Sequence, residues 1–117
     1  MMQTEKMEQA AVAALRDAKA QDISVLDVRE RSDFTDYMIV ATGTSNRHVL
    51  TLADKVEDRL RALGVRVLGR EGNEVAEWVV IDFGGIVVHL MRPQARAFYN
   101  LEKLWADGPG RESRQGG

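Results

Sequence analysis

Two apolar segments joined by a pair of glycines constrain the fold of this chain more than any other feature. Residues 78–83 and 86–91 are rich in β-branched and aromatic side chains, which is typical of strands. The pair Gly84-Gly85 between them suits a two-residue hairpin turn, because such turns need positive φ angles. One face of this hairpin is then wholly apolar and is predicted to be core; it carries Val79, Ile81, Phe83, Ile86, Val88 and Leu90.

The opposite face of the same hairpin is mixed and is predicted to meet solvent, a partner or a site. It carries Trp78, Val80, Asp82, Val87, His89 and Met91. Asp82 and His89 share this face on neighbouring strands, so one interpretation is a carboxylate-assisted base. A structural hydrogen bond or an interface pair is the other interpretation, and the lack of an attached serine or cysteine nucleophile favours it.

Hydrophobic periodicity predicts six further elements around the hairpin. They are a helix over about 5–20 with Thr4 as its N-cap, strands over 23–28 and 36–42, a helix between a Thr44 or Ser45 cap and Gly64, a strand over 65–70, and a helix over about 94–106 opened by Pro93. The order is αββαβββα. It predicts an α/β (α+β) fold, a single domain with a mixed sheet of about five strands and flanking helices.

Two details of this arrangement follow from the pattern. Residues 36–42 are apolar on both faces, which favours a central strand, and a helical crossover to 65–70 makes these two strands parallel with a right-handed connection. The middle helix is expected to bury Val49, Leu52, Ala53, Val56, Leu60 and Leu63. In the last helix, Tyr99 falls outside the expected core arc, which is formed by Phe98, Leu101, Leu104 and Trp105.

Length and composition restrict the class of protein. The 117 residues suffice for one domain, which we place at 1–107; the tail 108–117 lacks apolar residues and is predicted to be disordered. The chain has no cysteine and two histidines, so we expect no disulfide, no Cys-ligated metal and no His-rich metal site. A net charge of −2 argues against sequence-specific nucleic-acid binding.

The sequence shows neither a membrane-spanning segment nor a signal peptide. No apolar run approaches the roughly 20 residues that span a bilayer, and the acidic start of the chain does not resemble a signal peptide. We therefore expect a cytoplasmic protein without a membrane partner.

The turn at Gly43, Thr44 and Ser45 precedes a helix, where free N–H groups could cradle a phosphate. It resembles the Gly-Ser turn of nucleotidyltransferases, but those enzymes need paired acids on a following strand to hold magnesium. Residues 65–70 contain no acid. A tight turn with an N-cap is the simpler interpretation, and it also leaves Arg47 and His48 unfavourably placed in the first helical turn.

Two further groups carry alternative interpretations. Asp33 and Asp36 could bind a metal, although loop and capping roles are commoner for such residues. Trp78 and Tyr99 lie off the wholly apolar faces, and aromatic residues of this kind anchor protein interfaces.

The segment 36–60, DYMIVATGTSNRHVLTLADKVEDRL, closely resembles the ribosomal silencing factor family, also known as RsfS or Iojap. The matches cover nearly the whole folded unit in the family's order and spacing. They continue through Glu71-Gly72, Trp78, Ile81-Asp82 and Val87-Val88-His89 to the stretch RAFYNLEKLW at 96–105.

The resemblance implies a function without catalysis. Family members bind the large ribosomal subunit at its fourteenth protein and sterically hinder joining of the small subunit, which lowers translation when nutrients are short. Their fold is nucleotidyltransferase-like without catalytic acids, and they are described as homodimers. The alternatives are a nucleotidyltransferase-like phosphate-binding enzyme that uses the 43–45 turn and Asp82, and an adaptor that meets another partner through the Trp78 face.

The resemblance also assigns site residues. It places the partner surface at Trp78, Tyr99 and Leu101, with Asp82, His89 and Glu102 as rim or supporting residues. One departure is visible, because the family usually has Gly-Asp at the hairpin turn where this chain has Gly84-Gly85. Any polar contact of that aspartate is lost here.

Overall fold

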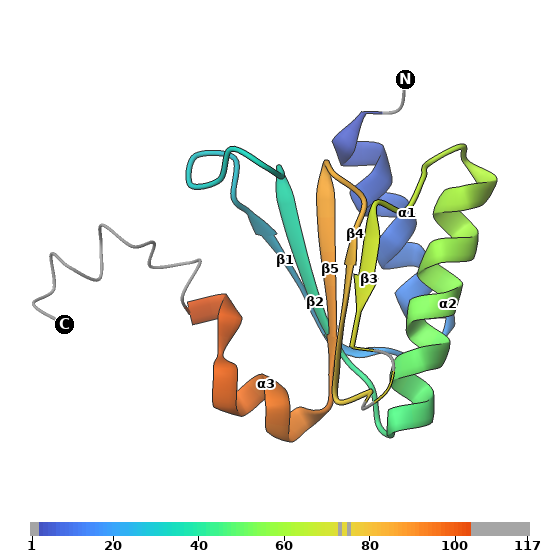
Figure 1. Cartoon of the computed structure of the whole chain (residues 1–117), viewed down its shortest axis with the longest axis vertical. Coiled ribbons are helices and arrows are strands. Elements are labelled where there is room, and N and C mark those ends of the chain that lie inside the picture. Colours follow the sequence, from blue (N-terminus) through green and yellow to red (C-terminus); the bar gives the residue numbers. More distant parts are fainter. Residues whose placement is uncertain (1–2, 73, 75, 104–117) are drawn as a thin grey trace, which may run out of the picture.

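A five-stranded mixed sheet forms the centre of the protein, whose computed structural model describes residues 3–72, 74 and 76–103 (Figure 1). The strands are β1 (Gln21–Asp27), β2 (Tyr37–Thr42), β3 (Gly69–Glu71), β4 (Trp78–Asp82) and β5 (Ile86–Met91). Their order across the sheet is β1-β2-β5-β4-β3, in which β2 and β5 are parallel and all other neighbours antiparallel. The predicted single α+β domain with a mixed sheet is confirmed.

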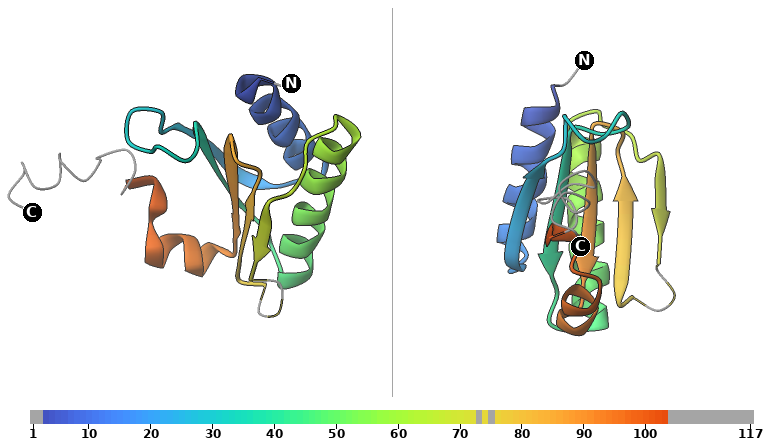
Figure 2. Two further views of the ribbon diagram at one scale, coloured as in Figure 1. Left: turned by 45° about the horizontal axis from the view of Figure 1, so that its top comes forward. Right: turned by 90° about the vertical axis from the view of Figure 1, so that its left-hand side faces the viewer.

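Three helices cover the sheet unequally. Helices α1 (Thr4–Asp17) and α2 (Asn46–Ala62) pack side by side on one face, whereas the short α3 (Pro93–Tyr99) lies against one end of the other face (Figures 1 and 2). None of the helices in the described residues is long and apolar enough to cross a membrane. The predicted tail at 108–117 lies outside the described residues.

The glycine hairpin forms as predicted. Trp78 pairs with Met91 and Asp82 with Val87, and Gly84 has the positive φ of +87° that the turn requires. The wholly apolar face of the hairpin is buried beneath α1 and α2. There it joins apolar residues of both helices, including Leu15, Leu52 and Leu60 with no exposed surface.

The ends of the first two helices differ from expectation in part. Ser45 is the N-cap of α2, as predicted, and its hydroxyl accepts a hydrogen bond from the backbone N–H of His48. Thr4 does not cap α1; Gln3 takes that position, and the Thr4 hydroxyl donates to Asp36 at 2.8 Å. Leu63 was predicted to be core but is 45% exposed, because α2 ends at Ala62.

The strand predicted over 65–70 is mostly wrong. Only Gly69–Glu71 is a strand, and it lies at the sheet edge, antiparallel to β4. It runs in the same direction as β2 but is separated from it by β5 and β4, so the parallel partner of β2 is β5. Alternating valines satisfied the strand pattern at 65–68, yet this segment has no strand pairing.

The last helix is interrupted within its predicted span. Pro93 opens α3, which ends at Tyr99 because Asn100 adopts a left-handed conformation with φ 47°, and residues 101–103 are helical again. The chain then turns, so the single arc predicted for this helix is wrong for Phe98, which is 81% exposed, while Leu101 is partly buried against the sheet. Leu104 and Trp105 lie outside the described residues.

Candidate functional site

Three aromatic rings gather where α3 meets the start of β4. The ring centroids of Trp78 and Tyr99 are 4.5 Å apart, and those of Phe98 and Tyr99 are 4.9 Å apart in an edge-to-face arrangement. Trp78 is partly buried, whereas Tyr99 is 51% exposed and Phe98 81% exposed. We call Trp78, Phe98 and Tyr99 the aromatic surface. It unites the two aromatic residues that the sequence singled out and adds Phe98.

His89 lies beneath Trp78 and fixes its orientation. The indole Nε1–H of Trp78 donates to His89 Nδ1 at 2.9 Å, and the centroids of the two rings are 5.8 Å apart. Burial lowers the pKa of His89 to about 4, so the imidazole is neutral near pH 7 and Nδ1 remains an acceptor. The ring is 8% exposed. His89 is therefore a supporting residue of the aromatic surface.

Asp82 shares the sheet face with His89 but takes no part in this contact. Its carboxylate accepts from the backbone N–H of Gly84 at 2.8 Å and so closes the hairpin turn. The structural hydrogen-bond interpretation holds for each residue separately, and they do not form a carboxylate–imidazole pair.

A charged network attaches α3 and the following turn to the sheet. The Arg96 guanidinium donates to both carboxylate oxygens of Glu102, at 2.9 and 2.6 Å, and also to the hydroxyls of Thr42 and Ser24. Ser24 in turn donates to Glu102 at 2.8 Å. The Arg96 hydrogen bond is the main reason that the pKa of Glu102 is lowered.

This network links β1, β2 and the two sides of the Asn100 turn. The side chains of Arg96 and Glu102 are only 13% and 28% exposed. Glu102 thus helps to hold the turn after α3, and its role at a partner surface stays a prediction, whereas Arg96 was not singled out. Its place in the stretch 96–105 was the only sequence signal, because its partners come from two strands distant in the chain.

A second apolar cluster forms the base of the surface. It consists of Val28, Met38, Val40, Met91 and Ala95, with Leu26, Trp78 and Leu101 packed against it. Leu101 therefore packs beneath the surface, while Tyr99 and Phe98 are exposed. Among the residues that the resemblance grouped, the structure thus separates a partly buried Leu101 from an exposed Tyr99.

The turn at residues 43–45 is closed by hydrogen bonds to His48. Thr44 N–H donates to His48 Nδ1 at 2.9 Å, and the Ser45 hydroxyl accepts from His48 N–H at 3.0 Å. His48 Nε2 then donates to the carbonyl of Ala18 at 2.9 Å, which links the start of α2 to the end of α1. The simpler interpretation, a capped turn, holds. It also explains the unfavourable position of His48, because its ring joins two helices.

Asp33 and Asp36 precede β2, and Asp36 takes part in structural hydrogen bonds. Asp36 accepts the hydroxyl hydrogen bond from Thr4, and its backbone N–H donates to Gly85. Across residues 3–72, 74 and 76–103, no three histidine or acidic side chains gather in a way that could hold a metal ion. Asp33 is exposed.

Comparisons with known proteins agree with this architecture. A family model described as ribosomal silencing factor during starvation matches residues 2–116. The ribosomal silencing factor RsfS of Chromobacterium violaceum is 43% identical over 104 residues, which are 89% of this chain and 85% of that protein. The mouse protein named mitochondrial assembly of ribosomal large subunit protein 1 is 37% identical over 97 residues, which are 80% of this chain and 42% of that protein.

Solved structures show the same likeness. A crystal structure of a protein from Chromobacterium violaceum matches this chain with a TM-score of 0.88 at 43% identity. The match covers 90% of this chain and 88% of that one.

The fold and the site define a single-domain α+β protein whose sheet presents an exposed aromatic surface held by a partly buried charged network. With the sequence matches, this assignment becomes specific. The chain belongs to the ribosomal silencing factor (RsfS) family.

Proposed function

We propose that the chain binds the large ribosomal subunit through its aromatic surface, at the subunit's fourteenth protein, and sterically blocks joining of the small subunit. The observation that carries this proposal is the exposed Tyr99 ring, supported by Trp78 at 4.5 Å. Rigid aromatic side chains with hydrogen-bonded surroundings are the usual anchors of protein interfaces. Family membership supplies the ribosomal context.

The choice of the large subunit has separate support. A relative that is 37% identical is named for assembly of the ribosomal large subunit. The net charge of −2 favours contact with ribosomal protein over contact with RNA, because RNA binding relies on many cationic contacts to phosphate. The proposed setting is the cytoplasm, with translation repressed when nutrients are limited.

A blocking mechanism requires binding alone. A surface of this kind needs no pocket, no cofactor and no reacting group, since a bound protein excludes the second subunit by volume. We further propose that the protein acts without catalysis and forms a homodimer when it is free of the ribosome. The phosphate-binding alternative is less favoured, because the Thr44 N–H and the Ser45 hydroxyl are both engaged by His48.

Binding to the isolated fourteenth protein of the large subunit tests the site. Tyr99→Ala is expected to weaken the affinity by on the order of 1–4 kcal/mol, measured by titration calorimetry. Trp78→Phe keeps a ring but removes the donor to His89, so it should weaken binding less. The matched control is Phe34→Ala, which removes a 90% exposed ring from the connection between β1 and β2, at the other end of the sheet from α3 (Figure 1). Unchanged affinity in a folded Tyr99→Ala variant would refute the assignment.

A further inference from the structure

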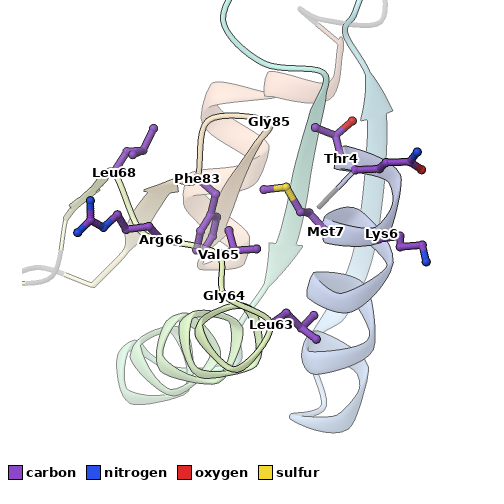
Figure 3. A pocket seen from close by; sticks show the side chains of 11 residues that line it. Thr4, Lys6, Met7, Leu63, Gly64, Val65, Arg66, Leu68, Phe83 and Gly85 are labelled. Atoms are coloured by element: carbon purple, nitrogen blue, oxygen red, sulfur yellow. The ribbon is translucent and has the colours of Figure 1, made fainter. Parts of the chain in front are cut away.

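A groove that the proposed function does not use lies at the end of the molecule where α1 begins, α2 ends and the hairpin turns (Figure 3). Its volume is about 1040 Å³. The sides come from the start of α1 and from residues 63–68, and Phe83 and Gly85 of the hairpin line it as well. We call it the α1–α2 groove. It is remote from α3, which lies at the opposite end of the sheet (Figure 1).

The groove presents apolar side chains to solvent. Leu68 is 65% exposed and Leu63 is 45% exposed, while Met7 and Phe83 beneath them are 6% and 5% exposed. An exposed leucine alone needs no explanation, but Leu63 and Leu68 lie on two sides of a buried apolar base, and a partner could desolvate both (Figure 3).

The charged residues that line the groove are all basic. Lys6 and Arg66 line it from opposite sides, and both side chains are exposed (Figure 3). No aspartate or glutamate is among the described residues that line it, although acidic residues outnumber basic ones in the chain as a whole. Neither cation forms an ion pair with any residue in 3–72, 74 and 76–103.

We propose that the α1–α2 groove docks an acidic segment of another protein that also carries apolar side chains. Charge complementarity selects this occupant, because Lys6 and Arg66 flank an apolar surface and, among the described residues, neither is in an ion pair and no carboxylate side chain lines the groove. The carboxylates of the segment pair with Lys6 and Arg66, and its apolar side chains cover Leu63 and Leu68. The groove volume lies at the upper end of the usual range of about 300–1,000 Å³ for small ligands, which leaves room for a peptide segment.

The groove and the aromatic surface lie at different ends of the molecule, so both can be occupied together. Binding of a partner in the groove is therefore compatible with binding of this chain to the ribosome. This inference does not rest on the proposed ribosomal function, since it uses no residue of the aromatic surface.

Selection from a random 12-residue peptide library displayed on phage tests the proposal. Two selections run in parallel, one on the wild-type protein and one on the double variant Arg66→Glu with Leu68→Ser. Both substitutions fall on exposed side chains, and thermal unfolding verifies that the variant is folded. Peptides enriched only on the wild-type protein are expected to combine Asp or Glu with Leu, Phe or Ile.

One enriched peptide is then synthesised and titrated against single variants. We expect Arg66→Glu, Lys6→Glu and Leu68→Ser each to weaken binding by about tenfold, and Arg47→Glu, a cation outside the groove, to change it less than about twofold. Tyr99→Ala should leave the affinity unchanged. The proposal is overturned if no peptide is enriched, if enriched peptides are basic or uncharged, or if the groove variants bind them as well as the wild-type protein does.

Discussion

The two faces of the sheet are stabilised in different ways. On one face, α1 and α2 cover a continuous apolar core in which Leu15, Leu52 and Leu60 have no exposed surface. On the other, α3 covers one end of the sheet and is held by the Arg96–Glu102 network, with Phe98 and Tyr99 exposed beside it. Hydrophobic burial specifies the first face, whereas the second combines a smaller buried apolar cluster with directional polar contacts that hold α3. A face of the second kind can present apolar rings to a partner without being buried by its own chain.

The largest effect should come from the continuous core. Leu52→Ala removes a fully buried side chain and is expected to lower the free energy of unfolding by about 3 kcal/mol. Phe98→Ala removes a larger side chain from the other face, yet it should change stability by less than about 0.5 kcal/mol because the ring is 81% exposed. Urea unfolding measures both. Equal losses would show that the two faces do not differ as described.

Acid should weaken the second face through His89. The unfolded chain takes up a proton near pH 6.5, whereas the folded chain does so near pH 4, because burial lowers the pKa of His89. The contribution of His89 to the free energy of unfolding is therefore fully present above about pH 6.5. It falls by up to about 3 kcal/mol as the pH decreases to 4.

The control for this pH dependence is His89→Gln, which removes the titrating group. Its stability should vary less than that of the wild-type protein between pH 6.5 and 4. The lowered pKa of Glu102 adds a loss at still lower pH, and that loss should persist in His89→Gln. If the wild-type protein and the variant lose stability in parallel over this range, His89 does not titrate as proposed.

Removing the charged network should have an intermediate effect. Arg96→Ala leaves Glu102, Ser24 and Thr42 without their shared donor, and the expected loss is about 2 kcal/mol. Arg61→Ala is the matched control, because its ion pair with Asp58 is exposed and should contribute less than about 0.5 kcal/mol.

Thermal unfolding distinguishes these two variants, and tryptophan fluorescence measured in a Trp105→Phe background reports on Trp78 when α3 loosens. An Arg96→Ala protein as stable as Arg61→Ala would mean that α3 is held by apolar contacts alone.

The smallest effect concerns the hairpin turn. A Cβ atom on Gly85 would lie 2.2 Å from Cγ2 of Thr4, so Gly85→Ala should cost on the order of 1 kcal/mol. Thr4→Ser removes that methyl group and keeps the hydroxyl that donates to Asp36. In the double variant the penalty should largely disappear, which a double-mutant cycle by urea unfolding measures. An additive cycle would exclude this contact as the reason.

The local sequence pattern was sufficient to predict elements whose interacting residues lie close together in the chain. The hairpin, its register and its buried face follow from two alternating segments around Gly84-Gly85. The cap at Ser45 and the buried stripe of α2 are equally local. These elements could be predicted because each depends on residues only a few positions apart.

Tertiary contacts decided the parts that could not be predicted. Val65 and Val67 alternate as in a strand, but these residues lie outside the sheet and Leu68 makes a backbone hydrogen bond to Asp82 just before β3. The left-handed Asn100 ends α3 where helical periodicity continued, and the Arg96–Glu102 pair across that turn depends on Ser24 and Thr42 from distant strands. The aromatic residues were identifiable, but their stacking depends on this same turn.

Sedimentation of the purified protein with separated ribosomal subunits, followed by subunit rejoining, tests the central proposal most directly. We expect the wild-type protein to travel with the large subunit only and to reduce formation of whole ribosomes, and folded Tyr99→Ala to do both more weakly. Binding to neither subunit, with rejoining unaffected, would contradict the proposed blockade. Blockade of equal strength by Tyr99→Ala would contradict its assignment to the aromatic surface.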